Sequence, residues 1–166
     1  MEQVTKQNVQ KQFEQFIQTA TNEDRSILSK ILDNLQQKKD STGSYLSAII
    51  KMEKSSLQDK ELEITLPVHP IVYNSLDMVH GGITATLADS AMGTLVHQLL
   101  PDHQTAVTSN LSVQYIRPGT GDYLRCRASV THQGRQLCVT EAKIVDNRNK
   151  LVATAQGTFM VIPKAK

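Results

Sequence analysis

The sequence predicts an α+β fold in which an antiparallel sheet covers one long helix. Residues 78–100 form an almost uncharged run whose apolar positions recur at helical spacing. Shorter runs with strand character stand around it, two before the run and four after it. Short turns between the later runs make them antiparallel neighbours. A lone long helix in such a sheet lies across one face and buries its apolar side there.

Composition sets the outer limits of function. The chain has 166 residues, enough for one core, and a formal charge of +2, too small to indicate nucleic acid. It has no Trp and few other aromatic residues, so platforms for stacking bases are scarce. The first residues are polar, so no signal peptide is expected. Cys126 and Cys138 lack metal-ligand spacing and indicate buried free thiols, which predicts a cytoplasmic location without a bound metal.

Residues 1–40 are predicted to form a helical extension. Two apolar stripes mark two helices: Val9, Phe13, Phe16, Ile17 and Ala20, then Ile27, Leu28, Ile31, Leu32 and Leu35. Thr21 is the expected N-cap of the second helix, with Glu23 and Asp24 in its first turn. We expect a helical hairpin that packs on the main domain or on a partner. A DNA-binding module is disfavoured because Lys and Arg are not clustered there.

Residues 44–163 are predicted to form the main domain. Its strands are expected at 45–52, 61–68, 105–116, 123–132, 136–146 and 151–162, with a polar turn at 53–60. In the run 105–116 one predicted face carries Val107, Leu111, Val113 and Tyr115, and the other carries Thr108, Asn110, Ser112 and Gln114.

Asp89 is the one formally charged residue between Met78 and Leu100. On a helix its neighbours three and four residues away are Ala85, Thr86, Met92 and Gly93, and none of them neutralises a carboxylate. Asp89 therefore either meets a partner from another element or has a chemical role, unless it is simply solvated. The run is too polar to be a membrane-spanning helix.

Gly81 and Gly82 stand where this helix is expected to begin. Glycine there leaves backbone N–H groups bare and directed along the helix axis, which suits an oxyanion or a polarised carbonyl group. The plain alternative is that the two glycines only make a turn.

The motif residues resemble a known family. The run Asn74…His80-Gly81-Gly82…Asp89 resembles the signature of hotdog-fold acyl-CoA thioesterases of the phenylacetyl-CoA thioesterase (PaaI-like) type. The resemblance covers roughly residues 44–163. It includes Tyr115-Ile-Arg-Pro118, Gly134-Arg135 and Gly157-Thr158-Phe159. Family members often have glycine where this chain has Asp77, and related enzymes carry serine where Thr108 falls.

The resemblance implies hydrolysis of acyl-CoA thioesters without a cofactor or metal. Gly81 would polarise the thioester through its N–H, Asp89 would be general base or nucleophile, and Thr108 would hold the water. Asn74 and His80 would orient the water or the thioester, while Gly82, Arg117 and Arg135 would bind substrate. Family sites form between two subunits. Because Gly81 and Asp89 lie on the order of 10 Å apart along one helix, we expect a homodimer or homotetramer.

Each assignment has a competing interpretation. Asn74 is also a typical turn residue, His80 a typical brace for a glycine turn, and Thr108 an ordinary strand residue. Arginines in turns, such as Arg117 and Arg135, are usually solvated. The N-terminal helices and Asp77 favour an alternative function, a hotdog module that binds an acyl-CoA or acyl ligand without hydrolysing it. An acyl-CoA hydratase on the same fold is disfavoured because His80 has no second acidic partner near the helix.

Overall fold

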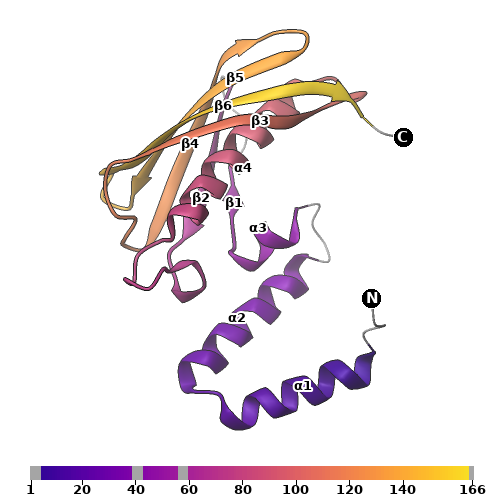
Figure 1. Cartoon of the computed structure of the whole chain (residues 1–166), viewed down its shortest axis with the longest axis vertical. Helices are drawn as coiled ribbons and strands as arrows, with labels where there is room; N and C mark the ends of the chain where they lie inside the picture. Colours follow the sequence, from indigo (N-terminus) through magenta and orange to yellow (C-terminus); the bar gives the residue numbers. More distant parts are fainter. Residues whose placement is uncertain (1–4, 39–42, 56–59, 165–166) are drawn as a thin grey trace. The chain divides into compact units, whose positions relative to one another are not determined.

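The chain divides into two compact units, Met1–Ile49 and Ile50–Lys166, and the computed structural model describes residues 5–38, 43–55 and 60–164 of them. The first unit holds the helices α1 (Lys6–Thr19), α2 (Asn22–Lys38) and α3 (Tyr45–Ile49). The second unit holds the sheet and the long helix α4 (Gly81–Leu99), which Figure 1 shows, and the 3-10 turn η1 (Pro70–Val72).

The two helices predicted for residues 1–40 are present. The N-cap prediction is also confirmed: the Thr21 hydroxyl accepts the N–H of Asp24 at 3.1 Å, and the Asp24 carboxylate accepts the N–H of Thr21 at 2.9 Å. The hydrogen bond from the Thr21 hydroxyl is the largest cause that lowers the pKa of Asp24. No residue of α1 or α2 is buried, so the packing of their apolar stripes on a partner stays a prediction.

The strand predicted at 45–52 is wrong. Tyr45–Ile49 is helix α3, and the Ser44 hydroxyl caps it by accepting the N–H of Ser47 at 3.1 Å. A short apolar run fits a helix as well as a strand, and here the cap decides. The first strand is instead β1 (Glu53–Lys54), inside the segment predicted as a turn. Residues 56–59 of that predicted turn lie outside the described residues, as do residues 39–42.

The later strands are confirmed to within two residues at each end. They are β2 (Glu61–Pro67), β3 (Gln104–Tyr115), β4 (Tyr123–Gln133), β5 (Leu137–Asp146) and β6 (Leu151–Pro163). All neighbouring strands are antiparallel, in the order β1-β2-β4-β5-β6-β3. Among the described strands, β3 therefore lies at one edge of the sheet and pairs with β6.

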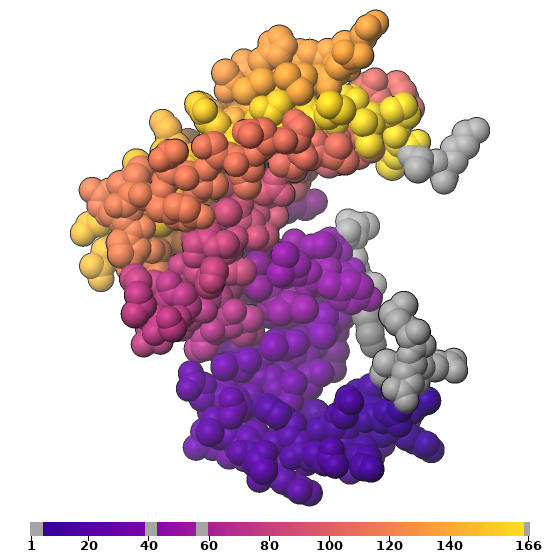
Figure 2. All heavy atoms as spheres, viewed as in Figure 1, coloured from indigo at the N-terminus to yellow at the C-terminus, as the bar shows by residue number. Residues whose placement is uncertain are grey.

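Helix α4 packs against β2 to β6, and the sheet curves over it in Figure 1. The atoms of β3 to β6 form one continuous body in Figure 2. The core side of the helix follows the predicted spacing: Leu87, Ala91, Leu95 and Val96 are fully buried. At Gly157 of β6, an added Cβ would lie 2.9 Å from the Phe159 ring and 3.0 Å from Met92, so glycine is what allows this close approach. Among the described residues, no helix is long and apolar enough to cross a membrane.

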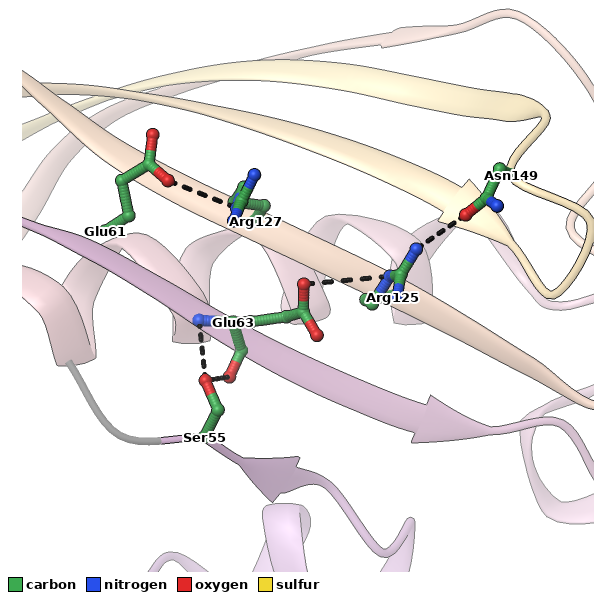
Figure 3. A network of polar contacts seen from close by, with 6 residues as sticks. All are labelled: Ser55, Glu61, Glu63, Arg125, Arg127 and Asn149. Carbon is green, nitrogen blue, oxygen red and sulfur yellow. Dashed lines mark hydrogen bonds and ion pairs between the residues drawn. The ribbon is translucent and has the colours of Figure 1, made fainter. Parts of the chain in front are cut away.

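The outer face of the sheet is polar. Along β4, Arg125 and Arg127 alternate with buried residues and point away from α4. Figure 3 shows their partners on β2: Arg127 meets Glu61 at 3.2 Å and Arg125 meets Glu63 at 3.7 Å. Arg125 also donates to the side chain of Asn149 at 2.6 Å, which joins β4 to the turn between β5 and β6. These two arginines are thus engaged on the face opposite the helix.

Candidate active site

Asn74 holds closed the loop that precedes α4. Its side-chain oxygen accepts the backbone N–H groups of Leu76 at 2.9 Å and Met78 at 3.3 Å, and its own N–H donates to the Met78 carbonyl at 2.8 Å. A bridge between Tyr73 and Val79 closes the base of the loop. Asn74 shapes this loop, as the turn interpretation holds, and a contact of its amide group with substrate stays a prediction.

Asp77 lies within this loop with φ of 55°, in the left-handed region that glycine adopts at no steric cost. The family pattern often has glycine at this point. Asp77 therefore adopts a backbone conformation that is also open to glycine, and the departure from the family pattern adds a charge to the loop. The side chain is exposed and does not line the pocket at the start of the helix.

His80 caps α4. Its Nδ1 accepts the N–H of Gly82 at 2.9 Å, and its carbonyl oxygen accepts the N–H of Ile83 at 2.9 Å and of Thr84 at 3.0 Å. Because Nδ1 accepts, the proton of neutral His80 lies on Nε2. The bracing role considered for His80 is therefore present. These bonds leave the N–H of Gly81 as the first-turn donor without an acceptor among the described residues.

Tyr115 contacts the same helix start from the end of β3. Its hydroxyl donates to the carbonyl oxygen of Gly81 at 2.8 Å, and a Cβ added at Gly81 would lie 3.6 Å from the ring. In the sequence, Tyr115 stands out only as part of the family resemblance and as one of the apolar residues of a predicted strand. The available signal was its position, an aromatic residue with a hydroxyl at the end of a strand.

Asp89 has a hydrogen-bond partner from another element, which is one of the alternatives that the sequence predicted. The Thr108 hydroxyl of β3 donates to Oδ1 of Asp89 at 2.8 Å. The carboxylate is half-buried, and Oδ2 has no donor among the described residues. A carboxylate with one oxygen fixed and the other open is arranged to bind a water molecule or to attack a carbonyl carbon.

A β-bulge in β3 sets which residues face α4. The register against β6 shifts between Thr108 and Asn110. Ala106 and Thr108 face the helix before the bulge, and Tyr115 faces it after the bulge. The uniform alternation predicted for 105–116 is therefore wrong at Val107, which is 48% exposed. The bulge is what allows one strand to direct both Thr108 and Tyr115 at the helix.

A pocket of about 280 Å³ lies at the N-terminal end of α4. Its lining includes three of the predicted site residues, Asn74, Gly81 and Arg117, together with Tyr115. Asp89 does not line it, since Asp89 lies eight residues further along the helix, about 12 Å at 1.5 Å per residue. Within one subunit the free N–H and the carboxylate are too far apart to act on one thioester.

The predicted substrate-binding arginines lie at opposite ends of the sheet. Arg117 lines the pocket and donates to the carbonyl oxygen of Leu151 at 2.9 Å. Arg135 is exposed in the turn between β4 and β5, where nearby Gln133 donates to the carbonyl oxygen of Leu99 at the far end of α4. Of these two arginines, Arg117 lines the pocket and Arg135 does not. Gly82 is exposed in the first turn of α4, beside that pocket.

The cysteines are structural. Both are free and buried, as predicted. Burial raises the pKa of the Cys126 thiol to about 12, and the Glu63 carboxylate adds to the effect. Burial also raises the pKa of Cys138. Neither thiol is a nucleophile at neutral pH.

Known sequences match the central part of the chain. The sequence profile described as the thioesterase superfamily matches residues 76–153. A Halobacterium salinarum protein is 33% identical over 127 residues, which cover 70% of this chain and 83% of that protein. The acyl-coenzyme A thioesterase PaaI of Escherichia coli is 34% identical over 95 residues, which cover 57% of this chain and 66% of that enzyme.

A known structure matches most of the chain. The crystal structure of a Bacillus halodurans protein with CoA superposes with a TM-score of 0.84 at 44% identity. The match covers 92% of this chain and 99% of the other. The unit Ile50–Lys166 alone contains less than 92% of the chain, so the match extends into the N-terminal unit, Met1–Ile49.

Proposed function

The chain belongs to the thioesterase superfamily, as a PaaI-like protein of the hotdog fold, and on that premise we propose that it hydrolyses acyl-CoA thioesters to a free acid and CoA. The observation that carries the proposal is the N–H of Gly81, which lies at a helix N-terminus beside a pocket and has no acceptor in the described part of the chain. Attack on a thioester carbonyl builds negative charge on its oxygen. A preorganised N–H donor stabilises that charge more than it stabilises the substrate.

Asp89 supplies the second half of the chemistry. As general base, its carboxylate takes a proton from water, the resulting hydroxide attacks the carbonyl carbon, and the C–S bond breaks with CoA leaving as the thiolate. As nucleophile, the carboxylate attacks the carbonyl carbon, the C–S bond breaks with CoA leaving as the thiolate, and water then hydrolyses the acyl anhydride that has formed. In both routes Thr108 fixes the carboxylate by its bond to Oδ1.

We propose that each active site takes Gly81 from one subunit and Asp89 from another. The separation along α4 supports this division. Strand β3 supports it too, because its outer edge is unpaired among the residues that the structure describes and pairing with a second copy would close that edge. The assembly is then a homodimer, or a homotetramer of two such dimers. Free buried cysteines fit a cytoplasmic location.

The nucleotide end of CoA carries phosphates, and we assign Arg117 and Arg135 to them. A twofold assembly with antiparallel helices brings the far end of one α4 towards the start of the other, so Arg135 of a second subunit approaches the pocket that Arg117 lines. The Bacillus halodurans relative was crystallised with CoA, which supports this ligand class. Arg117→Ala should raise KM for acyl-CoA more than for a thioester without the nucleotide. An equal rise for both substrates would rule out phosphate contact.

The deciding experiment measures CoA release with a thiol-trapping dye over a panel of acyl-CoA chain lengths and aromatic acyl groups. We expect turnover by the wild type and its loss in Asp89→Asn, with an unchanged circular dichroism spectrum. Equal release by both proteins would remove Asp89 from the mechanism. Tight binding of intact acyl-CoA without release by the wild type would favour the non-catalytic binding function.

Complementation tests the shared site. Asp89→Ala removes the carboxylate, and Gly81→Pro removes the N–H, so each variant should be inactive alone. After dissociation and equal mixing, half of the dimers are hybrids with one intact site of two, which restores roughly a quarter of wild-type activity. Full activity of a wild-type monomer identified by light scattering would contradict the shared site.

A further inference from the structure

The peptide group between Gly81 and Gly82 is hydrogen-bonded at both of its polar ends. The Tyr115 hydroxyl donates to its carbonyl oxygen at 2.8 Å, and its N–H donates to Nδ1 of His80 at 2.9 Å. The two side chains come from different elements, the edge strand β3 and the N-cap of α4. Rotation of this peptide group would break both bonds at once.

We propose that Tyr115 is a positioning residue for thioester hydrolysis: by holding the Gly81 carbonyl it fixes the first turn of α4 and directs the N–H of Gly81 at the thioester oxygen. This inference rests on the proposed function. The N–H belongs to the preceding peptide group, so Tyr115 acts through the backbone and need not touch the reacting atoms.

The physical need for such a residue follows from the sequence at the helix start. Two consecutive glycines have the widest backbone freedom, and the first N–H groups of a helix have no partners within it. A donor stabilises a developing charge well only if its direction is fixed beforehand. Tyr115 and His80 restrict this segment from both sides. The hydrogen bond from the Tyr115 hydroxyl to the carbonyl oxygen also polarises the peptide group, which strengthens the hydrogen bond from its N–H to His80.

Strand β3 holds α4 at two further points, and the one at Thr105 provides the control. The Thr108 hydroxyl binds Asp89 in the middle of the helix. Near its far end, the hydroxyl of Thr105 lies 2.8 Å from Nε2 of His97. Nδ1 of His97 lies 2.6 Å from the Gly93 carbonyl oxygen and donates to it, since a carbonyl only accepts. Thr105 thus joins the same strand and helix without touching the Gly81 turn.

The first test compares Tyr115→Phe with Thr105→Val in acyl-CoA hydrolysis. Tyr115→Phe keeps the ring beside Gly81 and removes only the hydroxyl, so we expect kcat to fall roughly 3- to 10-fold with KM unchanged, the size of one net hydrogen bond. Thr105→Val should leave kcat unchanged. Equal losses in the two variants would show a general loosening of β3 and overturn the proposal. A raised KM at constant kcat would make Tyr115 a substrate-binding residue instead.

The second test does not need activity. Tyr115→Phe should speed hydrogen exchange of the Gly82 amide, measured by NMR on the intact protein, while Thr105→Val leaves it unchanged. In kinetics, Tyr115→Phe and His80→Ala should be less than additive, because both release the same peptide group. Unchanged exchange together with additive kinetics would overturn the inference. Loss of Gly82 protection in a protein that hydrolyses no acyl-CoA would uphold the positioning contact while refuting the proposed function.

Discussion

The loop before α4 and the Asp89–Thr108 pair both carry motif residues, but they are held in different ways. In the loop, Asn74 and His80 bind backbone groups no more than four residues away. Asp89 is instead held by a hydroxyl nineteen residues further along the chain. The loop side chains therefore shape a backbone donor, whereas the Asp89 side chain is itself the reactive group. Substitutions that keep a hydrogen bond should be tolerated in the loop but not at Asp89.

Gly81→Pro gives the sharpest test of the backbone donor. Gly81 is the first residue of α4, where proline is well tolerated, and the preceding His80 has ψ of 134°, which a residue before proline commonly adopts. The variant loses only an N–H that has no acceptor among the described residues. We expect kcat to fall by about 10²–10³, as when one oxyanion donor is removed.

Gly81→Ala is the matched control. It keeps the N–H, and its Cβ would lie at an ordinary contact distance of 3.6 Å from Tyr115. Activity near that of the wild type is expected. If the alanine and proline variants lose similar amounts of activity with unchanged melting temperatures, then the absence of a side chain at Gly81 matters for activity and its N–H does not.

Thr108→Val removes the hydroxyl that holds Asp89 and keeps the shape of the side chain. A hydrogen bond to a charged group contributes about 1.5–3 kcal/mol, so we expect kcat to fall roughly 10- to 100-fold. Thr108→Ser keeps the hydroxyl and should retain most activity. If valine and serine variants are equally active, Asp89 is oriented without Thr108 and the contrast between the two regions disappears.

His80→Ala should cost less. It removes a cap with a typical contribution of about 1 kcal/mol, which corresponds to a loss of several-fold in kcat if the cap only orients the turn. His80→Asn restores a side-chain acceptor and should recover much of the activity, since asparagine is a favoured N-cap. Steady-state kinetics of the two variants checks this. A full loss in both would indicate that the imidazole itself takes part in the reaction.

The sequence predicts correctly those helices and strands that have a periodic pattern of apolar residues or clear turn residues at their ends. The spacing of Leu87, Ala91 and Leu95 predicted α4 and its buried side, and turn residues predicted the strands from Glu61 onward. Local patterns fail where a single contact decides. The cap at Ser44 turns an apolar run into α3, and the bulge near Thr108 reverses the facing of Val107.

In the candidate site, too, local sequence features predict some residues, whereas single contacts between distant residues decide others. Asp89 was predicted because a lone charge in an apolar helix needs a partner, and the partner is Thr108. The contact between Tyr115 and Gly81 joins residues 34 apart in sequence, and no periodicity predicts a pairing of that kind. Arg117 and Arg135 are equivalent as turn residues in the sequence, but Arg117 lines the pocket at the start of α4, whereas Arg135 lies in the turn beside Gln133, which contacts the far end of that helix.

The smallest expected effect lies at Asp77, and it tests whether the loop serves only as a support. A left-handed residue with a side chain costs about 1–2 kcal/mol, which Asp77→Gly would relieve. Glycine also has more conformational freedom in the unfolded chain, which lowers the free energy of unfolding by about 0.4–1 kcal/mol. The net gain in the free energy of unfolding is therefore about 0–1.6 kcal/mol, measurable by urea denaturation, and Asp77→Asn should stay near the wild type because asparagine also tolerates this conformation. Since the side chain is exposed and outside the pocket, kcat and KM should not change. A large change in KM for charged acyl groups, with stability unaltered, would instead make Asp77 a residue that selects substrate.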